Sequence, residues 1–377
     1  MPPMNNADTT LHTLSPWLPS IRADRSSPSE GTTPPLYLAL GEHWEFLRIS
    51  GPDAASFLQG QVTCDIREIA NGHLRLGAHC TAKGRIQASF LGFLDRTSTP
   101  AETSKPEAPK TEPKEASEAN PTSTTSFVML LPPGMTAPTQ QALAKYAMFA
   151  KVELSDASDA FQALMIGGRD AKSWCERVNL PVQETPYGLT QSSQSDKISL
   201  LDADLPLWLI ITTPKRSKEL QSQWPTTALA SGLEGWQRCL SELGQAHIHP
   251  NTQDKFIPQE LNYDQLNAIN FKKGCYKGQE IIARLHFKGT PKYRTYRFQW
   301  QSKVSPMIGE AVKDLHGETI GYIVHIARTG EANYDVLLVT KQTALNSSTL
   351  QTLSGDTPAT LTPHPLPNQV TSLDSTE

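Results

Sequence analysis

A polar, proline-rich stretch from residue 96 to 125 interrupts this chain between two apolar segments and limits how its surroundings can fold. It contains almost no apolar residue beyond alanine, so we expect it to be disordered, because it cannot offset the entropy of ordering. The segments on either side, Ile86–Leu94 and Phe127–Leu131, are apolar and aromatic and are both predicted to be strands. Closure entropy grows only logarithmically with loop length, so the stretch is predicted to be an insertion at the tip of one hairpin, not a linker between domains.

Strand-like and helix-like segments alternate on both sides of this hairpin, which indicates an α+β protein. The predicted strands are Trp44–Ile49, His73–Cys80, Lys151–Leu154, Ala163–Gly167 and Leu207–Thr212. Three helices are predicted in this part of the chain. The first has Pro52 in its first turn, and the other two cover Thr139–Phe149 and Ala171–Val178. Later in the chain come short strands with glycines at the turns, which predict a small closing β-barrel. They are Tyr293–Trp300, Thr319–Ala327 and Tyr334–Val339.

Composition excludes several classes of protein. The chain has 377 residues, 38% of them hydrophobic and 19% charged, with a net charge of −4, which fits a globular protein that is not a nucleic-acid binder overall. Its five cysteines form no C-x-x-C pair, which argues against a zinc ribbon, a self-contained cluster site or a disulfide scaffold. No segment is predicted to span a membrane or to direct secretion or mitochondrial import, so we expect a cytoplasmic protein.

One cysteine has an unusual setting. Cys275 lies between Gly274 and Gly278 at the entrance to a helix predicted for Gln279–Leu285. The helix dipole and three nearby lysines favour a thiolate, so this sulfur is a candidate nucleophile or ligand. The glycines would permit positive φ and close approach of a substrate. The alternative is an ordinary turn with Cys275 as a small buried hydrophobe. The apolar stripe of the helix is predicted to be Ile281, Ile282 and Leu285.

The same region is basic, with eight lysines and arginines from residue 272 to 297 against the single acid Glu280. This indicates an anionic partner, such as a polyglutamate tail, a phosphate or RNA, or else a solvated basic face. The block comprises Lys272, Lys273, Lys277, Arg284, Lys288, Lys292, Arg294 and Arg297. Upstream, Gln259, Asn262 and Asp264 can hydrogen-bond a planar heterocycle or equally well cap turns.

Together these segments resemble the YgfZ family of folate-binding proteins, relatives of the glycine-cleavage aminomethyltransferase (T-protein). The family signature K-G-C-[YF]-x-G-Q-E is met in full by Lys273–Glu280. The likeness extends from about Leu36 to Val339. Supporting matches are Phe57–Thr63, the turn Ala82–Arg85, Arg238, and Phe256–Gln259 followed by Asn262.

The resemblance implies an α+β, aminomethyltransferase-like cloverleaf of three subdomains around a central hole, with a small C-terminal β-barrel. The expected organisation is a disordered tail at 1–34, a folate-binding region at 35–285, a barrel at 286–345 and a mostly disordered tail at 346–377. The expected ligand is tetrahydrofolate or a derivative, and the implied role is to support assembly or repair of iron–sulfur proteins, including radical enzymes that thiolate tRNA. The implied partners are folate and iron–sulfur client or assembly proteins, with tRNA reached indirectly, and no membrane.

By carry-over from the family, Cys275 is the functional thiol and a candidate transient ligand of an iron–sulfur cluster. Residues expected to act with it are Lys273, Tyr276, Gln279 and Glu280, and those expected to bind the folate are Gln59, Gln61, Thr63, Gln259, Asn262 and Arg284. The residues leave open whether Cys275 ligates a cluster transiently, shares one with a partner or attacks an electrophile.

Two other functions are left open. The first is a tetrahydrofolate-dependent aminomethyltransferase, although Ala88 and Ser89 stand where T-proteins carry an Asp-Asp pair. The second is a module that binds tRNA directly through the basic block, with strongly salt-dependent affinity and no need for the thiol. We expect an accessory factor without classical turnover rather than either of these two functions.

Overall fold

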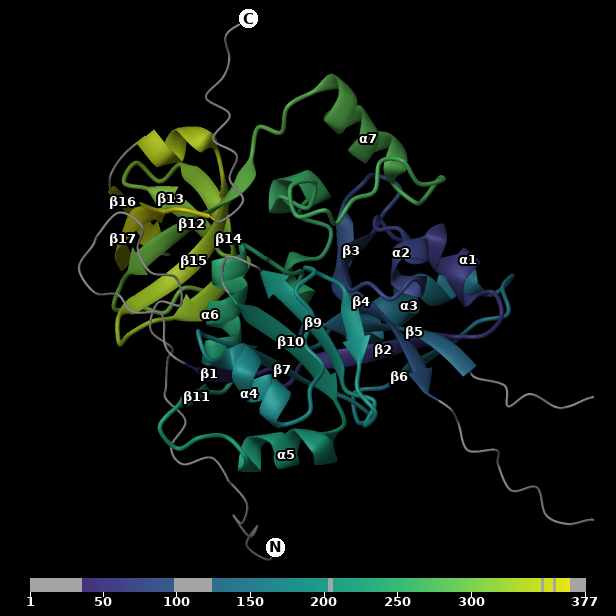
Figure 1. Cartoon of the computed structure of the whole chain (residues 1–377). Helices are drawn as coiled ribbons and strands as arrows, with labels where there is room; N and C mark the ends of the chain where they lie inside the picture. The colour runs from purple at the N-terminus through teal and green to yellow at the C-terminus, as the bar shows by residue number, and fades with distance from the viewer. Residues whose placement is uncertain (1–35, 98–123, 203–205, 347–348, 355–356, 367–377) are drawn as a thin grey trace, which may run out of the picture.

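The protein is built from two β-sheets and a closed β-barrel, with helices between and outside them (Figure 1). The computed structural model describes residues 36–97, 124–202, 206–346, 349–354 and 357–366. The expected tail at 1–34 and most of the expected insertion at 96–125 lie outside these ranges. In the described part of the chain, no helix is long and apolar enough to cross a membrane.

The first sheet has five strands in the order β3-β4-β5-β2-β6. They are β2 (Glu45–Ser50), β3 (Arg75–Cys80), β4 (Ile86–Thr97), β5 (Thr124–Leu131) and β6 (Glu153–Asp156). β4 and β5 are antiparallel, and their register runs from Leu91 opposite Leu130 to Thr97 opposite Thr124. The two strands that flank the polar stretch therefore form one hairpin. The helices of this part are α1 (Ala54–Gln59), α2 (Ile66–Ala70) and α3 (Thr136–Ala147).

The second sheet has six strands in the order β11-β1-β7-β10-β9-β8. They are β1 (Tyr37–Leu40), β7 (Gln162–Gly167), β8 (Leu189–Gln191), β9 (Lys197–Asp202), β10 (Leu207–Thr212) and β11 (Leu229–Ser231). Leu209 and Ile211 of β10 face the main core, whereas Trp208 and Ile210 pack under α4 (Ala171–Arg177) and α5 (Pro214–Ser222). Both faces of this sheet are buried, which is why β10 is a continuous apolar run.

Helix α6 (Leu233–Leu243) lies between the second sheet and the barrel (Figure 1). It contacts β1 on one side and β14 and β15 on the other. Trp236, Cys239 and Leu240 are all buried, and so are the charged residues Arg238 and Glu242. A helix buried around most of its circumference holds the parts of a fold together, and its charges need partners.

The barrel closes in the order β12-β15-β14-β13-β16-β17, because β17 pairs with β12. Its strands are β12 (Arg294–Gln301), β13 (Ala311–Asp314), β14 (Thr319–Arg328), β15 (Asn333–Thr340), β16 (Leu350–Ser354) and β17 (Thr357–His364). The expectation of a mostly disordered tail from residue 346 was wrong for the last two strands. Ala359 and Leu361 of β17 alternate into the barrel core. β17 pairs with the free edge of β12, and β16 pairs with that of β13. The threonines and prolines around them hid this alternation.

Between α6 and the barrel the chain forms short turns η1 (Pro250–Thr252) and η2 (Pro258–Leu261), an extended loop and then α7 (Gln279–Lys288). After α7 the chain enters the barrel, and a 3₁₀ turn, η3 (Gln342–Asn346), follows β15. The predicted helix after the cysteine loop is present, but only Ile282 of its expected apolar stripe is buried. Ile281 is 40% exposed and packs beside the turn at Gly84.

Candidate functional site

Lys273 fixes the cysteine loop to the segment that follows α1. Its side chain is buried, and Nζ donates to the backbone carbonyls of Val62 at 2.7 Å and Cys64 at 2.8 Å. The same ammonium lies 5.0 Å from the centre of the Tyr276 ring. Desolvation by burial lowers the pKa of Lys273 to about 8. The lysine of the signature is therefore an internal anchor.

Three further contacts hold the second half of the loop. Lys277 N donates to the Gly60 carbonyl at 3.1 Å, and Gln279 Oε1 accepts from Tyr276 N at 3.3 Å. Gly278 has φ of +83°, and a Cβ at this position would lie 2.5 Å from the carbonyl oxygen of Thr81. Only glycine fits here without displacing backbone, so the loop is pressed against the turn at residues 81–84.

Cys275 is the exposed member of the five cysteines, all of which lie in the described part of the chain. Burial raises the pKa of the Cys64 and Cys175 thiols to about 12. It also raises the pKa of the Cys80 and Cys239 thiols. These four are therefore inert structural thiols. Cys275 is instead exposed to solvent, and the loop is anchored both before and after it. The alternative prediction, that Cys275 is a small buried hydrophobe, is therefore wrong.

The two glycines of the loop differ. Gly274 has no atom within 4 Å of the place where a Cβ would be, and its φ is not in the left-handed region. Open space therefore surrounds the backbone just before the thiol, whereas the space at Gly278 is filled by protein. Glu280 and Arg284 of α7 are exposed to solvent.

The first group of residues expected to bind folate is used inside the protein. Gln59 Nε2 donates to Asp65 Oδ1 at 3.0 Å, and its Oε1 accepts from Ile66 N at 2.8 Å. Thr63 is fully buried, donates to the Ala268 carbonyl at 2.7 Å and accepts from Ala78 N at 2.9 Å. These bonds shape the turn between α1 and β3. Gln61 is adjacent, and its Oε1 is buried with no hydrogen-bond partner in the described residues.

The second group ties the loop region to its neighbours. Gln259 Nε2 donates to the Ile282 carbonyl at 2.7 Å. Asn262 ends η2 with φ of +59°, and its Nδ2 donates to the Thr295 carbonyl at 2.7 Å. Asp264 pairs with Arg294 of β12 at 2.8 Å. Asn262 thus caps a turn, as one of the two interpretations expected, and all three side chains fasten this segment to α7 and to the barrel.

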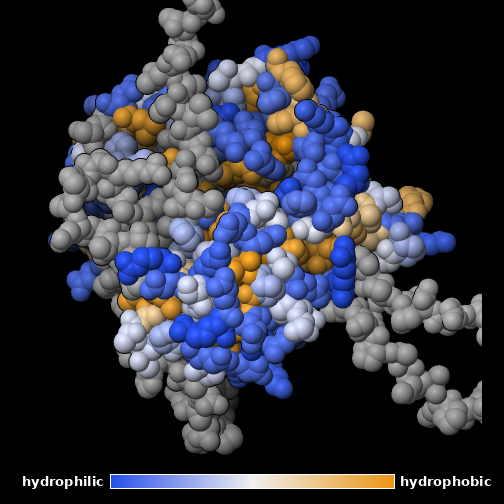
Figure 2. All heavy atoms as spheres, viewed as in Figure 1, coloured by the Kyte–Doolittle hydropathy of each residue, from blue (hydrophilic) through white to orange (hydrophobic). Residues whose placement is uncertain are grey.

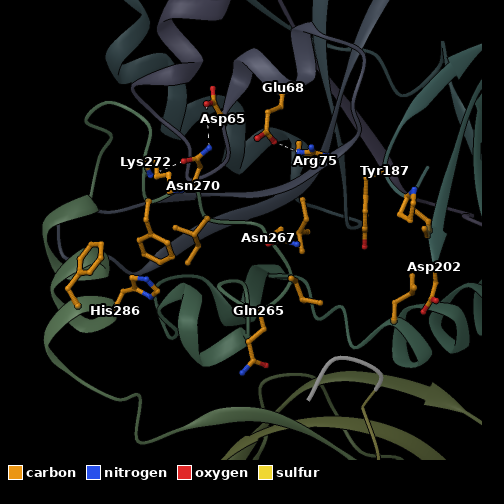
Figure 3. Close-up of a pocket in the computed structure, with 18 residues that line it drawn as sticks. Asp65, Glu68, Arg75, Tyr187, Asp202, Gln265, Asn267, Asn270, Lys272 and His286 are labelled. Atoms are coloured by element: carbon orange, nitrogen blue, oxygen red, sulfur yellow. Dashed lines mark hydrogen bonds and ion pairs between the residues drawn. The ribbon is translucent and has the colours of Figure 1, made fainter. Parts of the chain in front are cut away.

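A cavity of 790 Å³ opens between the two sheets and the loop that leads to Cys275 (Figure 3). In the space-filling view, apolar residues come to the surface between α7 and the sheets, within a hydrophilic rim (Figure 2). None of the residues expected to bind folate lines this cavity. Its lining is Asp65, Glu68, Arg75, Leu76, Pro186, Tyr187, Leu201, Asp202, Leu243, Gln265, Leu266, Asn267, Ile269, Asn270, Phe271, Lys272, His286 and Phe287.

The wall near α2 carries charged groups in fixed positions. Asp65 accepts from Arg67 Nη2 at 2.7 Å, and this hydrogen bond is the main reason that the pKa of Asp65 falls to about 2. Glu68 forms an ion pair with Arg75 across the same wall (Figure 3). Asp65 already accepts from Gln59, Arg67 and Asn270 and its side chain is only 6% exposed. This wall therefore offers the Glu68 carboxylate as an acceptor and the Arg75 guanidinium as a donor.

The opposite wall is aromatic. The rings of Phe271 and His286 are stacked, with centroids 3.7 Å apart and planes 11° apart. Phe287 meets this pair edge-on, at 6.1 Å from Phe271, and is 68% exposed. Lys272 follows Phe271 on the same wall (Figure 3). A flat stacked surface next to a cation can bind a planar ring that carries a carboxylate.

Asn270 connects the cavity to the cysteine loop. It lines the cavity, and its N donates to the Thr63 carbonyl at 2.9 Å. Its Oδ1 accepts from the backbone N of Lys272 at 2.8 Å and of Lys273 at 3.0 Å. A ligand that moves this asparagine therefore acts on the residue that starts the loop of Cys275.

The basic block is smaller than the sequence suggests. Arg297 is buried against Glu242 and Asp335, and Arg294 pairs with Asp264. Lys273 is the internal anchor described above, so three of the eight cations are used inside the protein. In the part of the chain that the structure describes, no group of three or more His, Cys, Asp or Glu is arranged to hold a metal ion.

Relatives of known identity share most of this chain. It is 29% identical to the tRNA-modifying protein YgfZ of Aliivibrio fischeri (strain MJ11) over 282 residues. The matched region covers 73% of this chain and 74% of that protein. It is 27% identical to the YgfZ of Yersinia enterocolitica over 350 residues, and this matched region covers 89% of the chain and 94% of the relative. No family model matches the chain.

Among solved structures, the chain is similar to the glycine cleavage system aminomethyltransferase T of Bartonella henselae, with a TM-score of 0.62. The likeness covers 88% of this chain and 86% of that one, at 15% sequence identity, and so concerns the fold alone. The chain is therefore a homologue of the YgfZ proteins, built on the aminomethyltransferase fold.

Proposed function

We propose that this chain binds tetrahydrofolate or a related folate in the central cavity and supports the assembly or repair of iron–sulfur proteins through Cys275. Its clients on this proposal include radical enzymes that thiolate tRNA, which fits the name of its tRNA-modifying relatives. One observation carries the proposal: the exposed thiol stands on a loop that is anchored on both sides, and Asn270 of the cavity wall starts that loop.

The chemistry of the cavity fits a folate. A folate has a flat heterocycle with amino and amide donors, an aromatic linker and a carboxylate tail. The carboxylate of Glu68 suits the donors, the stacked pair Phe271 and His286 suits a ring, and Lys272 suits a carboxylate. When bound, a folate supplies a carrier for one-carbon units. The residues expected from the family motif, Gln59 to Thr63, would then act by shaping the wall behind the ligand.

Cys275 would meet the cluster chemistry on the outside of the protein. One thiolate cannot hold an iron–sulfur cluster alone, so the cluster or its iron is cargo shared with a partner protein. The exposure of the thiol and the open space beside Gly274 support such an encounter. The anchors at Lys273 and Gly278 reduce the entropy lost when the partner docks. We place the protein in the cytoplasm, where thiols stay reduced.

An aminomethyltransferase activity has weaker support. Ala88 and Ser89, where an acidic pair would fall, are fully buried and do not line the cavity. Ser89 Oγ accepts from Ile248 N at 2.8 Å and contacts His247 Nδ1 at 3.3 Å, so it holds the core together.

Calorimetric titration with tetrahydrofolate tests the cavity, and iron–sulfur enzyme activity in cells tests the thiol. We expect Cys275→Ala to bind tetrahydrofolate like the unaltered protein and to lose support of iron–sulfur enzymes. Absence of binding at both low and high salt would refute the folate site. Full activity of iron–sulfur enzymes in cells that carry only Cys275→Ala would refute the role of the thiol.

A further inference from the structure

The end of helix α3 exposes an apolar patch. Tyr146 is 42% exposed, Met148 75% and Phe149 93%, and the three lie within four consecutive residues. Their contacts with water are unfavourable, because removing apolar surface from water stabilises a protein or a complex. We refer to Tyr146, Met148 and Phe149 as the α3 patch.

The α3 patch lies beside the cysteine loop. Lys277 Nζ is 4.5 Å from the centre of the Tyr146 ring, and Lys277 is two residues after Cys275. The position of Lys277 is fixed by its backbone bond to Gly60 and by contact of Nζ with Gln87 Oε1 at 3.4 Å. The Tyr146 side of the patch is therefore in contact with the loop that carries the exposed thiol.

The charges around the patch are mainly positive. Lys145 and Lys151 are exposed on either side of it, and Lys277 lies over Tyr146. Within the described residues none of these three lysines has an ion-pair partner. Acids in this region include Glu153 and Asp254, which are exposed, and Asp53, whose carboxylate accepts from the backbone N of Lys151. An incoming surface with carboxylates at its rim would complement this arrangement.

We propose that the α3 patch is the docking site of an iron–sulfur protein whose contact face is apolar at its centre and acidic at its rim. This inference rests on the proposed function, since docking here brings the partner to Cys275. Tyr, Phe and Met are enriched in the cores of protein interfaces, and an exposed aromatic next to a cation is a typical anchor. Two aromatic rings flanked by lysines would also suit a single-stranded nucleic acid, so an RNA adduct is one of the outcomes that overturn the proposal.

Site-specific photo-crosslinking in cells tests this surface. The full chain carries p-benzoylphenylalanine in place of Phe149, and a matched control carries it in place of Leu315, which is 63% exposed on the barrel. We expect a discrete adduct from position 149, identified by mass spectrometry as an iron–sulfur protein. Adding Met148→Asp or Lys277→Glu should lower its yield on the order of tenfold. An adduct with lipid, RNA, a second copy or the chain itself overturns the proposal, as does an adduct no stronger than that of the control.

A second readout separates failure of docking from failure of the proposed function. Phe149→Asp and Leu315→Asp each replace one exposed apolar side chain, so neither should alter the fold or tetrahydrofolate binding. We expect Phe149→Asp alone to lower iron–sulfur enzyme activity in cells, as Cys275→Ala does. If Cys275→Ala lowers that activity and Phe149→Asp leaves it unchanged, the docking site is wrong and the function stands. If neither variant lowers it, both are wrong.

Discussion

Arg297 of β12 and Asp335 of β15 form a bidentate ion pair inside the protein. Arg297 Nε donates to Asp335 Oδ1 at 2.9 Å and Nη2 donates to Oδ2 at 2.6 Å, and the two side chains are only 2% and 1% exposed. Burial by itself raises the pKa of Asp335, but the guanidinium outweighs it and holds the pKa below its ordinary value.

This pair belongs to a network of four charges that joins the barrel to α6. Arg297 also donates to both carboxylate oxygens of Glu242, at 3.0 and 2.9 Å. Arg238 pairs with Glu242 at 2.9 Å and also with Asp335. Two positive and two negative charges therefore balance, although Arg238 Nε is buried with no hydrogen-bond partner among the described residues. The geometry fixes the orientation of the barrel against the helix.

We expect Asp335→Ala to destabilise the protein by about 3–5 kcal/mol, because it leaves two buried guanidinium groups to share the single carboxylate of Glu242. The measurement is the shift of the urea unfolding midpoint. Glu184→Ala is the control, since it removes an ion pair with Lys172 that is exposed on both sides. It should leave the midpoint unchanged. Equal midpoints for the two variants would show that the network adds nothing to stability.

The low pKa of Lys273 predicts a pH dependence. The folded protein releases this proton near pH 8, whereas the unfolded chain keeps it to about pH 10.5, so the unfolded state binds more protons in between. The stability of the unaltered protein relative to Lys273→Met should therefore rise by about 1–2 kcal/mol from pH 8 to pH 9.5. A neutral amine still has two N–H groups for the carbonyls of Val62 and Cys64.

Urea unfolding of both proteins at pH 8, 8.75 and 9.5 measures this difference directly. Taking the difference between the two proteins removes the titration of groups that they share. A difference that stays constant across this range would mean that the amine of Lys273 is not desolvated in solution.

The sequence predicted many elements well because their signals are local. Runs such as Leu207–Thr212 and the alternating strands of the barrel contain their own evidence of burial. The strands β16 and β17 were not predicted, because they contain few apolar residues, such as Ala359 and Leu361 of β17, among threonines and prolines. Their pairing depends on the edges of strands that lie tens of residues earlier.

The site was predicted unevenly for the same reason. The exposed thiol of Cys275 followed from its motif, but whether Lys273 faces solvent or the interior depends on carbonyls 211 and 209 residues away. The cavity combines Asp65, Tyr187 and His286 from three separate parts of the chain. No spacing rule connects such residues. Lys272, His286 and Phe287 stood within the segment that the sequence marked as basic, but nothing in the sequence shows that the rings of Phe271 and His286 stack, so the aromatic wall was missed.

That aromatic wall gives a prediction about affinity. We expect Phe271→Ala and His286→Ala each to weaken tetrahydrofolate binding about 3- to 10-fold, because a stacked aromatic pair contributes about 0.5–1.5 kcal/mol beyond its buried area. Phe271→Tyr keeps the ring and should bind nearly normally. Calorimetry measures all three, with circular dichroism to confirm the fold. Normal affinity in both alanine variants would place the ligand ring elsewhere.

The two glycines beside Cys275 offer a matched pair of substitutions. Gly278→Ala would place a methyl group 2.5 Å from the Thr81 carbonyl oxygen at φ of +83°, so the loop must shift. We expect it to cost on the order of 1–3 kcal/mol of stability. Gly274→Ala meets no atom within 4 Å and needs no left-handed backbone. It should be neutral or stabilise the fold by about 0.4–1 kcal/mol.

The same pair tests how a partner reaches the thiol. Gly278→Ala should lower iron–sulfur enzyme activity in cells by displacing Cys275, in proportion to its effect on stability. Gly274→Ala adds a methyl group in the open space next to the sulfur and leaves the loop in place. If that variant folds normally yet loses cellular activity, the partner approaches the backbone at Gly274 closely, and the glycine is required for binding. If it keeps full activity, the partner contacts the sulfur alone, and Gly278 is the glycine that the signature needs.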